Sequence, residues 1–245
     1  MDSSEFQFQF IHLNSVESTN IYAHKLIQEE NVLEGFVITT GFQEKGKGQQ
    51  TKMWESEPDK NLLMSVLLKP NWKVGCQFEW SKMVALSIKE SLDSLAVGKV
   101  QVKWPNDILI EGEKVAGILI ENSIIGETIS NSIVGIGLNV NQTNFESFPR
   151  VATSLKLKGG REYELEEIRA NILESLRKKY YEFDLGTVKK DYLNALYGYG
   201  VPKKFQDNEG DFTGVILGVL PNGRLQLNKN GKLKDYEVKE IVFLD

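Results

Sequence analysis

The twenty residues from 102 to 121, VKWPNDILIEGEKVAGILIE, constrain the fold more strongly than any other part of the 245-residue chain. Two apolar stretches flank the charged turn Glu-Gly-Glu-Lys, and this pattern predicts a β-hairpin. A hairpin has no local need for the cation, indole, proline ring, amide and carboxylate that occupy positions 103 to 107 in succession. A second cation, Lys114, follows 11 positions after Lys103. These residue types therefore point to a role beyond the hairpin itself.

Apolar periodicity predicts the other elements of the chain. We expect strands at residues 6–13, 35–43, 61–69, 100–110, 114–122 and 130–140, and helices at 18–30, 78–95, 165–185 and 187–197. Strands that follow one another in sequence favour antiparallel pairing, so the expected fold class is α+β with a mixed, largely antiparallel sheet. After residue 198, short β runs and Gly-containing turns predict a small β-barrel. The expected domains are residues 1–198 and 199–245.

Charge and cysteine content narrow the class of protein. The net charge of −5 argues against a dedicated nucleic-acid-binding protein. The single cysteine, Cys76, cannot form a disulfide framework and suits a reducing compartment. We find neither a secretory signal nor a run of about 18 apolar residues that would span a membrane. A cytoplasmic protein is expected.

A long polar loop, residues 44–60, separates two predicted strands. Loops of this length in a compact domain are usually functional or disordered. The sequence Gly46-Lys47-Gly48 offers backbone N–H groups and a cation to an anion, and Trp54 offers a flat apolar face. The alternative is a solvated lysine loop without a ligand.

Several motifs occur in a fixed order along the chain: Ser18-Thr19-Asn20, Gln43 with Gly-Lys-Gly, Trp54, KWPNDILIEGEKVAGILIE and GIGLNVN. In this combination the chain resembles the biotin protein ligase family, in the form without an N-terminal DNA-binding domain. The resemblance runs from about residue 10 to the end. It implies a class II synthetase-like catalytic domain in 1–198 and an SH3-like β-barrel in 199–245.

The resemblance also implies a two-step reaction. Biotin and ATP, with Mg²⁺, give biotinyl-5′-adenylate and pyrophosphate, and a lysine of a biotin carboxyl carrier protein then attacks the mixed anhydride. The first step brings a carboxylate toward an anionic phosphate, so the site needs fixed cations more than a general base. The catalytic cations implied are Lys103, Lys114 and Lys47.

The expected binding residues follow from the same resemblance. Those for biotin are Ser18, Thr19, Asn20, Gln43, Lys47, Gly48, Gln49, Lys114 and Gly117. Those for ATP and the adenylate are Gly46, Lys47, Gly48, Lys52, Trp54, Asn106 and Asn139. Asp107 either holds magnesium or orients a lysine. We expect loop 44–58 to become ordered when the adenylate binds, with Trp54 brought near the base.

Some alternatives stay open at this point. Ser18-Thr19-Asn20 is also a common helix cap, and the glycines of GIGLNVN are also compatible with plain strand packing. Gln49 and Thr51 stand where the family frequently has arginine and glycine. A lipoate–protein ligase is the nearest alternative function, and a nucleic-acid-binding β-barrel is the non-enzymatic one. No DNA or membrane partner is expected, and the resemblance admits a monomer or a homodimer.

Overall fold

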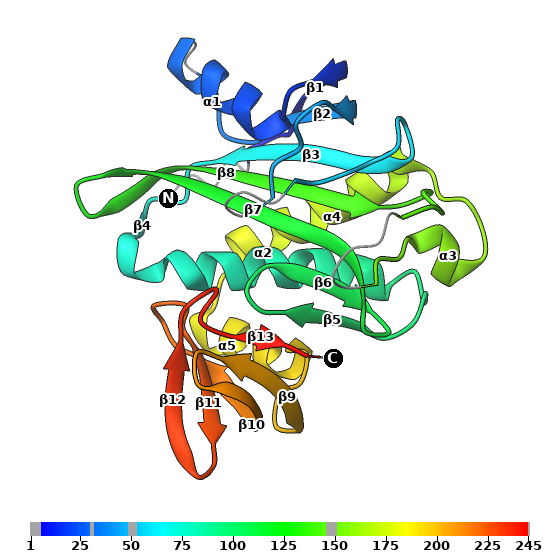
Figure 1. Cartoon of the computed structure of the whole chain (residues 1–245). Helices are drawn as coiled ribbons and strands as arrows, with labels where there is room; N and C mark the ends of the chain where they lie inside the picture. The colour runs from blue at the N-terminus through cyan, green and yellow to red at the C-terminus, as the bar shows by residue number, and fades with distance from the viewer. Residues whose placement is uncertain (1–5, 30–31, 49–52, 146–150, 245) are drawn as a thin grey trace.

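The computed structural model describes residues 6–29, 32–48, 53–145 and 151–244. Its main layer is an eight-stranded sheet with the strand order β1-β2-β3-β8-β7-β6-β5, and β4 pairs with β8 (Figure 1). The pairing of β1 with β2 is parallel and the other pairings are antiparallel. The strands are β1 (Gln9–Val16), β2 (Phe36–Gln43), β3 (Asn61–Leu68), β4 (Trp72–Lys73), β5 (Val100–Lys103), β6 (Asp107–Ile110), β7 (Glu113–Ile125) and β8 (Thr128–Asn139). The expected α+β class with a mixed, largely antiparallel sheet is confirmed.

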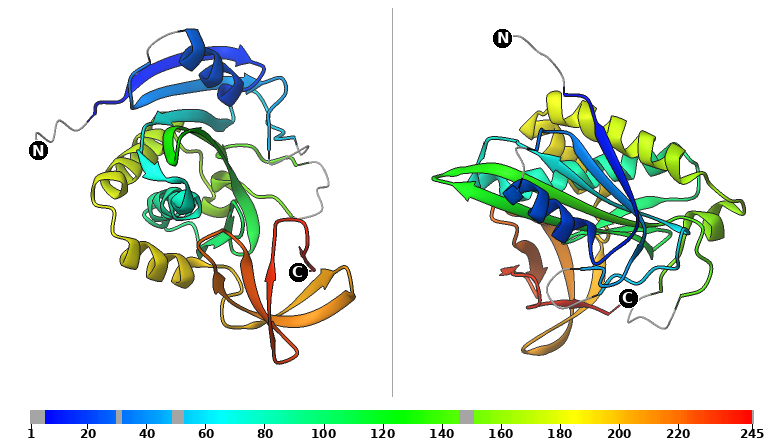
Figure 2. Two further views of the ribbon diagram at one scale, coloured as in Figure 1. Left: turned by 90° about the vertical axis from the view of Figure 1, so that its left-hand side faces the viewer. Right: turned by 90° about the horizontal axis from the view of Figure 1, so that it is seen from above.

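Helices cover both faces of this sheet. Helix α1 (Thr19–Glu29) packs Ala23 against Ile38, Leu67 and Ile133 on one face. The main core lies on the other face, beneath α2 (Gln77–Asp93), α4 (Leu165–Tyr181) and α5 (Leu185–Ala195) (Figure 2). Short helical turns, η1 (Val74–Cys76) and α3 (Leu155–Gly159), precede α2 and α4. Among the described residues, no helix has the length and apolar character needed to cross a membrane.

The segment 102–121 forms two reversals of the chain where one was expected. Strand β5 ends at Lys103 and β6 begins at Asp107, so the expected strand 100–110 is divided by a turn at residues 104–106. The expected hairpin joins β6 to β7 through Glu111 and Gly112, whose φ angles are +50° and +81°. The first turn is anchored on β7, since Ile118 donates its N–H to the Asn106 carbonyl oxygen at 3.0 Å.

A second sheet follows α5, with the strand order β12-β11-β10-β9-β13. Its strands are β9 (Pro202–Asp207), β10 (Gly210–Val219), β11 (Leu225–Lys229), β12 (Lys232–Tyr236) and β13 (Val242–Phe243). The β-rich tail was expected, but closure into an SH3-like barrel is not confirmed. Within the described residues, β12 and β13 are the two open edges, and β13 is too short to pair with more than Phe205 and Gln206 of β9.

Candidate active site

A row of residues crosses the main sheet on the α1 face. Lys103 lies opposite Asp107, Asp107 opposite Gly117, and Gly117 opposite Gly137. Directly opposed residues of neighbouring strands point to the same face of a sheet. The register therefore brings residues of the KWPND run (103–107), the KVAGI sequence (114–118) and the GIGLN sequence (135–139) together on one face of the sheet.

Lys114 reaches this row through an ion pair. Its ammonium lies 2.7 Å from Asp107 Oδ1, and both side chains are partly exposed. Two backbone hydrogen bonds hold the main chain of Lys114. Its N–H donates to the Val151 carbonyl, and its carbonyl accepts from the Thr153 N–H. Of the two roles left open for Asp107, orienting a lysine is the one that the contacts favour.

The described residues do not fit a resident metal ion. They contain no group of three or more histidine, cysteine, aspartate or glutamate side chains that would hold one. The carboxylate of Asp107 is already engaged by an ammonium group. A magnesium ion held by one carboxylate would need most of its remaining ligands from water or from substrate phosphates.

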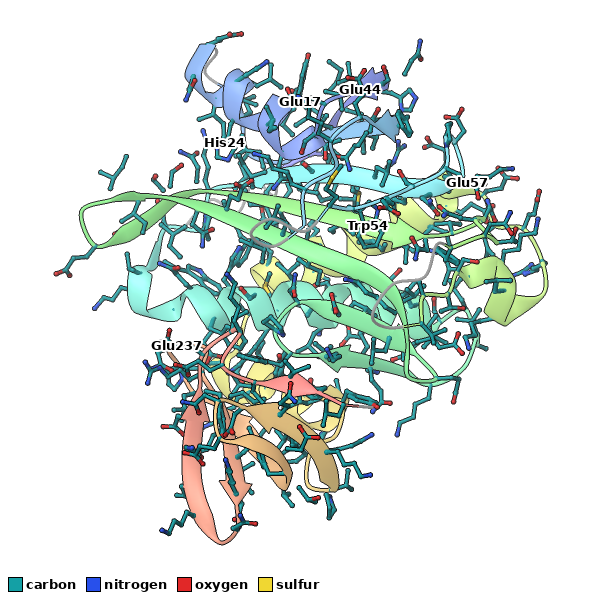
Figure 3. The ribbon with its side chains drawn as sticks, in the orientation of Figure 1. Glu17, His24, Glu44, Trp54, Glu57 and Glu237 are labelled. Atoms are coloured by element: carbon teal, nitrogen blue, oxygen red, sulfur yellow. The ribbon has the colours of Figure 1, made fainter. Side chains whose placement is uncertain are left out.

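Trp54 lies at the main sheet (Figure 3), and its indole packs against the two glycines of the row. A Cβ atom at Gly137 would lie 2.5 Å from Trp54 Cε2, and one at Gly117 would lie 3.0 Å from Cζ3. Any side chain at Gly137 would therefore displace the ring. The indole Nε1 is buried, and within the described part of the chain it has no hydrogen-bond partner. A buried donor of this kind is costly unless a ligand or water satisfies it.

The polar loop closes on itself around this tryptophan. Trp54 donates its N–H to the Gly46 carbonyl at 2.8 Å, and Lys47 forms an isolated bridge with Met53. A Cβ atom at Gly46 would lie 2.4 Å from the Trp54 carbonyl oxygen, which explains why glycine is needed there. Lys47 is exposed, and Gly48 is the last residue described before the gap. Gln49, Thr51 and Lys52, and with them much of the expected ordering of the loop, lie outside the described residues.

The ring of Trp54 lies on the sheet because Gly117 and Gly137 leave room for close packing. The expectation that loop 44–58 becomes ordered when the adenylate binds stays a prediction.

The Ser18-Thr19-Asn20 motif starts α1 and is buried. Thr19 donates its backbone N–H and its hydroxyl to Gln43 Oε1, at 2.9 and 3.1 Å. The hydroxyl of Ser65 lies 2.7 Å from Thr19 Oγ1 and 2.6 Å from Asn20 Oδ1. Of the expected biotin-site residues, Thr19 and Gln43 are thus bonded directly, and Asn20 is linked to Thr19 through Ser65.

Two members of this network were not among the residues expected from the sequence: Ser65 on β3 and Glu121 on β7. Asn20 Nδ2 donates to Glu121 Oε2 at 2.7 Å. Ser65 carried a signal, because it is the polar residue inside the fully buried strand NLLMSVLL. Glu121 carried none, since a glutamate on a partly exposed strand is ordinary.

The remaining expected residues are engaged by the protein. The Lys103 ammonium lies 4.6 Å from the ring centroid of Phe243 on β13. Asn106 Nδ2 donates to the Ile118 carbonyl at 2.7 Å, so this group ties the 104–106 turn to β7. Asn139 Nδ2 donates to the Thr153 carbonyl at 3.0 Å, and this asparagine is 4% exposed.

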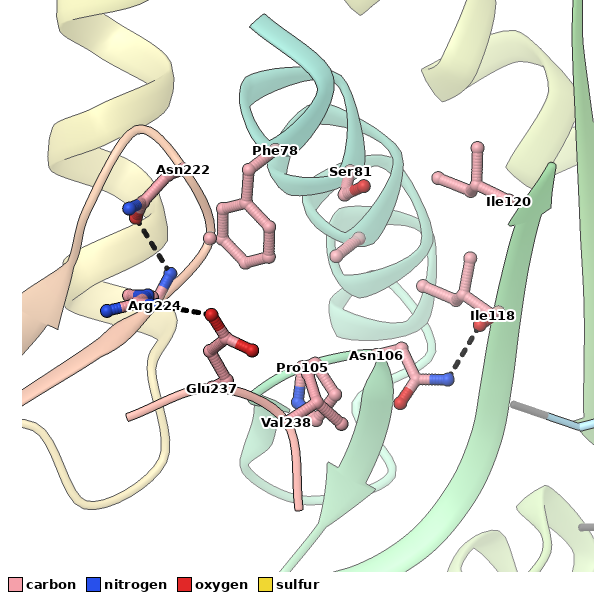
Figure 4. Close-up of a pocket in the computed structure, with 12 residues that line it drawn as sticks. Phe78, Ser81, Pro105, Asn106, Ile118, Ile120, Asn222, Arg224, Glu237 and Val238 are labelled. Atoms are coloured by element: carbon pink, nitrogen blue, oxygen red, sulfur yellow. Dashed lines mark hydrogen bonds and ion pairs between the residues drawn. The ribbon is translucent and has the colours of Figure 1, made fainter. Parts of the chain in front are cut away.

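A separate cavity of about 600 Å³ lies on the opposite face of β7 (Figure 4). Ile118 and Ile120 line it, and they alternate along the strand with Gly117. Phe78 of α2 and Arg224, in the turn between β10 and β11, close its other sides. The row of motif residues thus does not open into this cavity, although Asn106 borders both.

Comparisons with known proteins agree with the motifs. The model of the Biotin/lipoate A/B protein ligase family matches residues 13–139. The chain is 29% identical over 231 residues to the bifunctional ligase/repressor BirA of Bacillus subtilis (strain 168), covering 91% of this chain and 70% of that protein. It is 25% identical over 219 residues to the biotin–[acetyl-CoA-carboxylase] ligase of Mycobacterium tuberculosis, covering 86% and 80%.

Among solved structures, the chain is similar to the biotin protein ligase of Aquifex aeolicus in complex with biotin and ATP. The TM-score is 0.77 at 27% sequence identity, and the match covers 97% of this chain and 98% of that one. The similarity therefore includes both sheets.

Proposed function

The chain belongs to the biotin/lipoate A/B protein ligase family, and we propose on this premise that it is an ATP-dependent biotin–protein ligase. It activates biotin as biotinyl-5′-AMP and transfers the biotinyl group to a lysine of a biotin carboxyl carrier protein. One observation carries the proposal. The row of Lys103, Asp107, Gly117 and Gly137, with Lys114 paired to Asp107, lies in the main sheet. The match to a ligase in complex with biotin and ATP covers 97% of this chain.

In the first step, a biotin carboxylate oxygen attacks the α-phosphorus of ATP, and pyrophosphate leaves. Both reactants are anionic, so fixed cations lower the barrier most. We assign this role to Lys103 and Lys114, with Lys47 as the cation of the loop. Asp107 Oδ1 lies 2.7 Å from the Lys114 ammonium and holds it beside Gly117. Magnesium arrives with the nucleotide phosphates, and we assign it no ligand on this chain.

Biotin is bound at the α1 end of the site. Gln43 Oε1 accepts both hydrogen bonds from Thr19, and Gln43 Nε2 lies on the side of Gly46. This orientation leaves an N–H donor for the ureido oxygen of biotin. Ser18 and the Gly46-Lys47-Gly48 segment complete the polar end. The space beside Gly117, which was expected to admit biotin, is taken by the Trp54 ring.

The adenosine moiety is bound beside Trp54 and Asn139. Asn139 donates to Thr153, which leaves its Oδ1 oxygen to accept from the adenine amino group. The indole N–H of Trp54, which has no partner among the described residues, is a donor that a bound adenylate would satisfy.

In the second step, the amine of the acceptor lysine attacks the acyl carbon of biotinyl-AMP, and AMP leaves. The relatives named biotin–[acetyl-CoA-carboxylase] ligase support a carboxyl carrier protein as the acceptor. We propose a cytoplasmic location, since the one cysteine is a free thiol and ATP is a substrate. We propose no DNA partner, in keeping with the net charge of −5.

The first half-reaction tests the proposal without a carrier protein. Incubation with biotin, ATP and Mg²⁺ should yield biotinyl-AMP and support biotin-dependent exchange of pyrophosphate into ATP. Biotin with ATP should also raise the melting temperature, because a ligand that binds only the folded state stabilises it. If lipoate with ATP supports exchange and stabilises the protein while biotin does not, the chain is a lipoate ligase instead.

A further inference from the structure

Other groups of the protein occupy the hydrogen-bonding positions of the Asn20 side-chain amide. Its Nδ2 donates to Glu121 Oε2 at 2.7 Å and to the Leu119 carbonyl at 3.3 Å, which occupies both N–H bonds. Its Oδ1 accepts from the Ser65 hydroxyl at 2.6 Å. Asn20 is 3% exposed. An amide with two donors has none left for a ligand, so Asn20 cannot donate a hydrogen bond to biotin in this arrangement.

Gly135 makes room for the side chain of Asn20. A Cβ atom at Gly135 would lie 2.4 Å from Asn20 Oδ1 and 3.0 Å from its amide carbon. Any larger residue would force the amide away from β7 and β8. At this position of the GIGLN sequence, a side chain of the protein fills the space beside the glycine, which is the packing role left open for these glycines.

Glu121 fixes which way the Asn20 amide faces. A carboxylate only accepts hydrogen bonds, so the amide nitrogen must face Glu121 and the amide oxygen must face Ser65. His24 Nε2 lies 3.4 Å from the same Glu121 oxygen, on the outer side of α1. The polarity of the network is therefore set at Glu121, outside the proposed biotin contacts.

Ser65 connects the Asn20 amide to Thr19, which lies nearer the proposed biotin contacts. Its side chain is fully buried, and its oxygen also lies 2.7 Å from Thr19 Oγ1. The backbone N–H of Thr19 in turn donates to the Gln43 amide oxygen at 2.9 Å. A continuous hydrogen-bonded path thus leads from the edge of the site at Glu121 to the amide that faces the ligand.

We propose that Glu121 is a positioning residue for biotin, acting through Asn20 and Ser65 to hold Thr19 and Gln43 in their binding orientation. The proposal rests on the assignment of this site to biotin. Glu121 touches no substrate. Its removal should weaken biotin binding and leave the chemical step and the nucleotide site nearly unchanged.

The test compares Glu121→Ala with Glu121→Gln in the full-length protein. Biotin titrated in a calorimeter without ATP should bind Glu121→Ala about tenfold more weakly than wild type, since an acceptor bonded to a buried amide is lost. The KM for biotin should rise by a similar factor, while the KM for ATP and the kcat at saturating biotin stay close to wild type. Glu121→Gln should restore most of the affinity, because its amide oxygen can still accept from Asn20.

Glu127→Ala is the matched control, since Glu127 is an exposed glutamate on the same β7–β8 hairpin. It should bind biotin like wild type. If Glu121→Ala does not fold, Ser65→Ala interrupts the same path at its middle and should show the same selective loss. Wild-type biotin affinity in Glu121→Ala or in Ser65→Ala would overturn the inference, as would an equal rise in both KM values. Failure of the wild-type protein itself to bind biotin would instead overturn the proposed function.

Discussion

At the scale of single residues, the pairing of Asp107 with Lys114 decides what the KWPND motif can do. The carboxylate lies between a strand end and a lysine ammonium 2.7 Å away, and it shares a cross-strand row with Gly117. An ion pair with both members partly exposed contributes little to stability. Its value lies in holding the ammonium over the glycines, where the anionic reactants are expected to meet.

Asp107→Asn separates an orienting role from a metal-binding role. We expect pyrophosphate exchange to fall by up to about a hundredfold, because a misplaced catalytic group loses this much. The magnesium concentration for half-maximal exchange should stay unchanged, since the ion is carried by the nucleotide. Measuring exchange across a magnesium titration checks this. A rate that excess magnesium restores would show that Asp107 is a metal ligand after all.

The sequence motifs suggested the candidate site residues, whose roles stay predictions, but they did not indicate the directions of the side chains. Asp107, Gly117 and Gly137 share one row because of the strand register. Trp54 lies outside the strands and reaches these glycines from the loop, and Lys103 lies over Phe243. Asn20, expected to bind biotin, spends its amide on other protein groups. An amide's orientation depends on partners that are about 45 and 101 positions away in sequence, and no local pattern encodes them.

At the scale of elements, local periodicity predicted most helices and strands, and long-range pairing decided the rest. The turn at residues 104–106 divides an apolar run that reads as one strand, because Asn106 is anchored on β7. The parallel pairing of β1 with β2, and the open edge of the second sheet, likewise depend on partners distant in sequence. The domain division at residues 198 and 199 stays a prediction.

The buried carboxylate of Asp207 stabilises the second sheet through several hydrogen bonds. The Asp207 side chain is 1% exposed and accepts from Lys229 at 2.7 Å, Tyr236 at 2.8 Å and the Glu209 N–H at 2.9 Å. Burial alone would raise the pKa of this carboxyl. The hydrogen bonds and the Lys229 charge outweigh it and hold the pKa of Asp207 far below its usual range.

This depressed pKa predicts how stability depends on pH. Because the folded-state pKa lies below the unfolded value of about 4, the Asp207 contribution is present above pH 4 and is lost as the pH falls further. Asp207→Asn should lower the free energy of unfolding at pH 7, and its difference from wild type should shrink below about pH 4. Urea unfolding at several pH values measures this. The exposed Asp211→Asn controls for the loss of one aspartate charge from the same sheet. A difference between Asp207→Asn and wild type that stays constant with pH would contradict the assignment.

At the scale of the whole molecule, the two sheets meet at the KWPND turn. The indole N–H of Trp104 donates to the Gly223 carbonyl at 2.8 Å, and the neighbouring Lys103 ammonium lies over Phe243. Trp104 is 3% exposed and belongs to a core cluster that includes residues of both sheets. The second sheet is thus packed against the same turn that carries Lys103 and Asp107, and we expect it to help position them.

Trp104→Phe tests whether this junction matters to the reaction or only to stability. Trp80 provides a matched control, because it is also buried and its indole donates to the Ser132 hydroxyl at 2.7 Å within the main layer. Each replacement removes the same ring volume and one hydrogen bond, so each should cost about 1–3 kcal/mol of stability. Only Trp104→Phe should also slow pyrophosphate exchange, since it alone loosens the turn next to Lys103, the cation to which we assign a role in the first step. Chemical denaturation and exchange assays at a temperature where both variants are folded make the comparison. Equal exchange rates in the two variants would mean that the second sheet stabilises the main one without shaping its site.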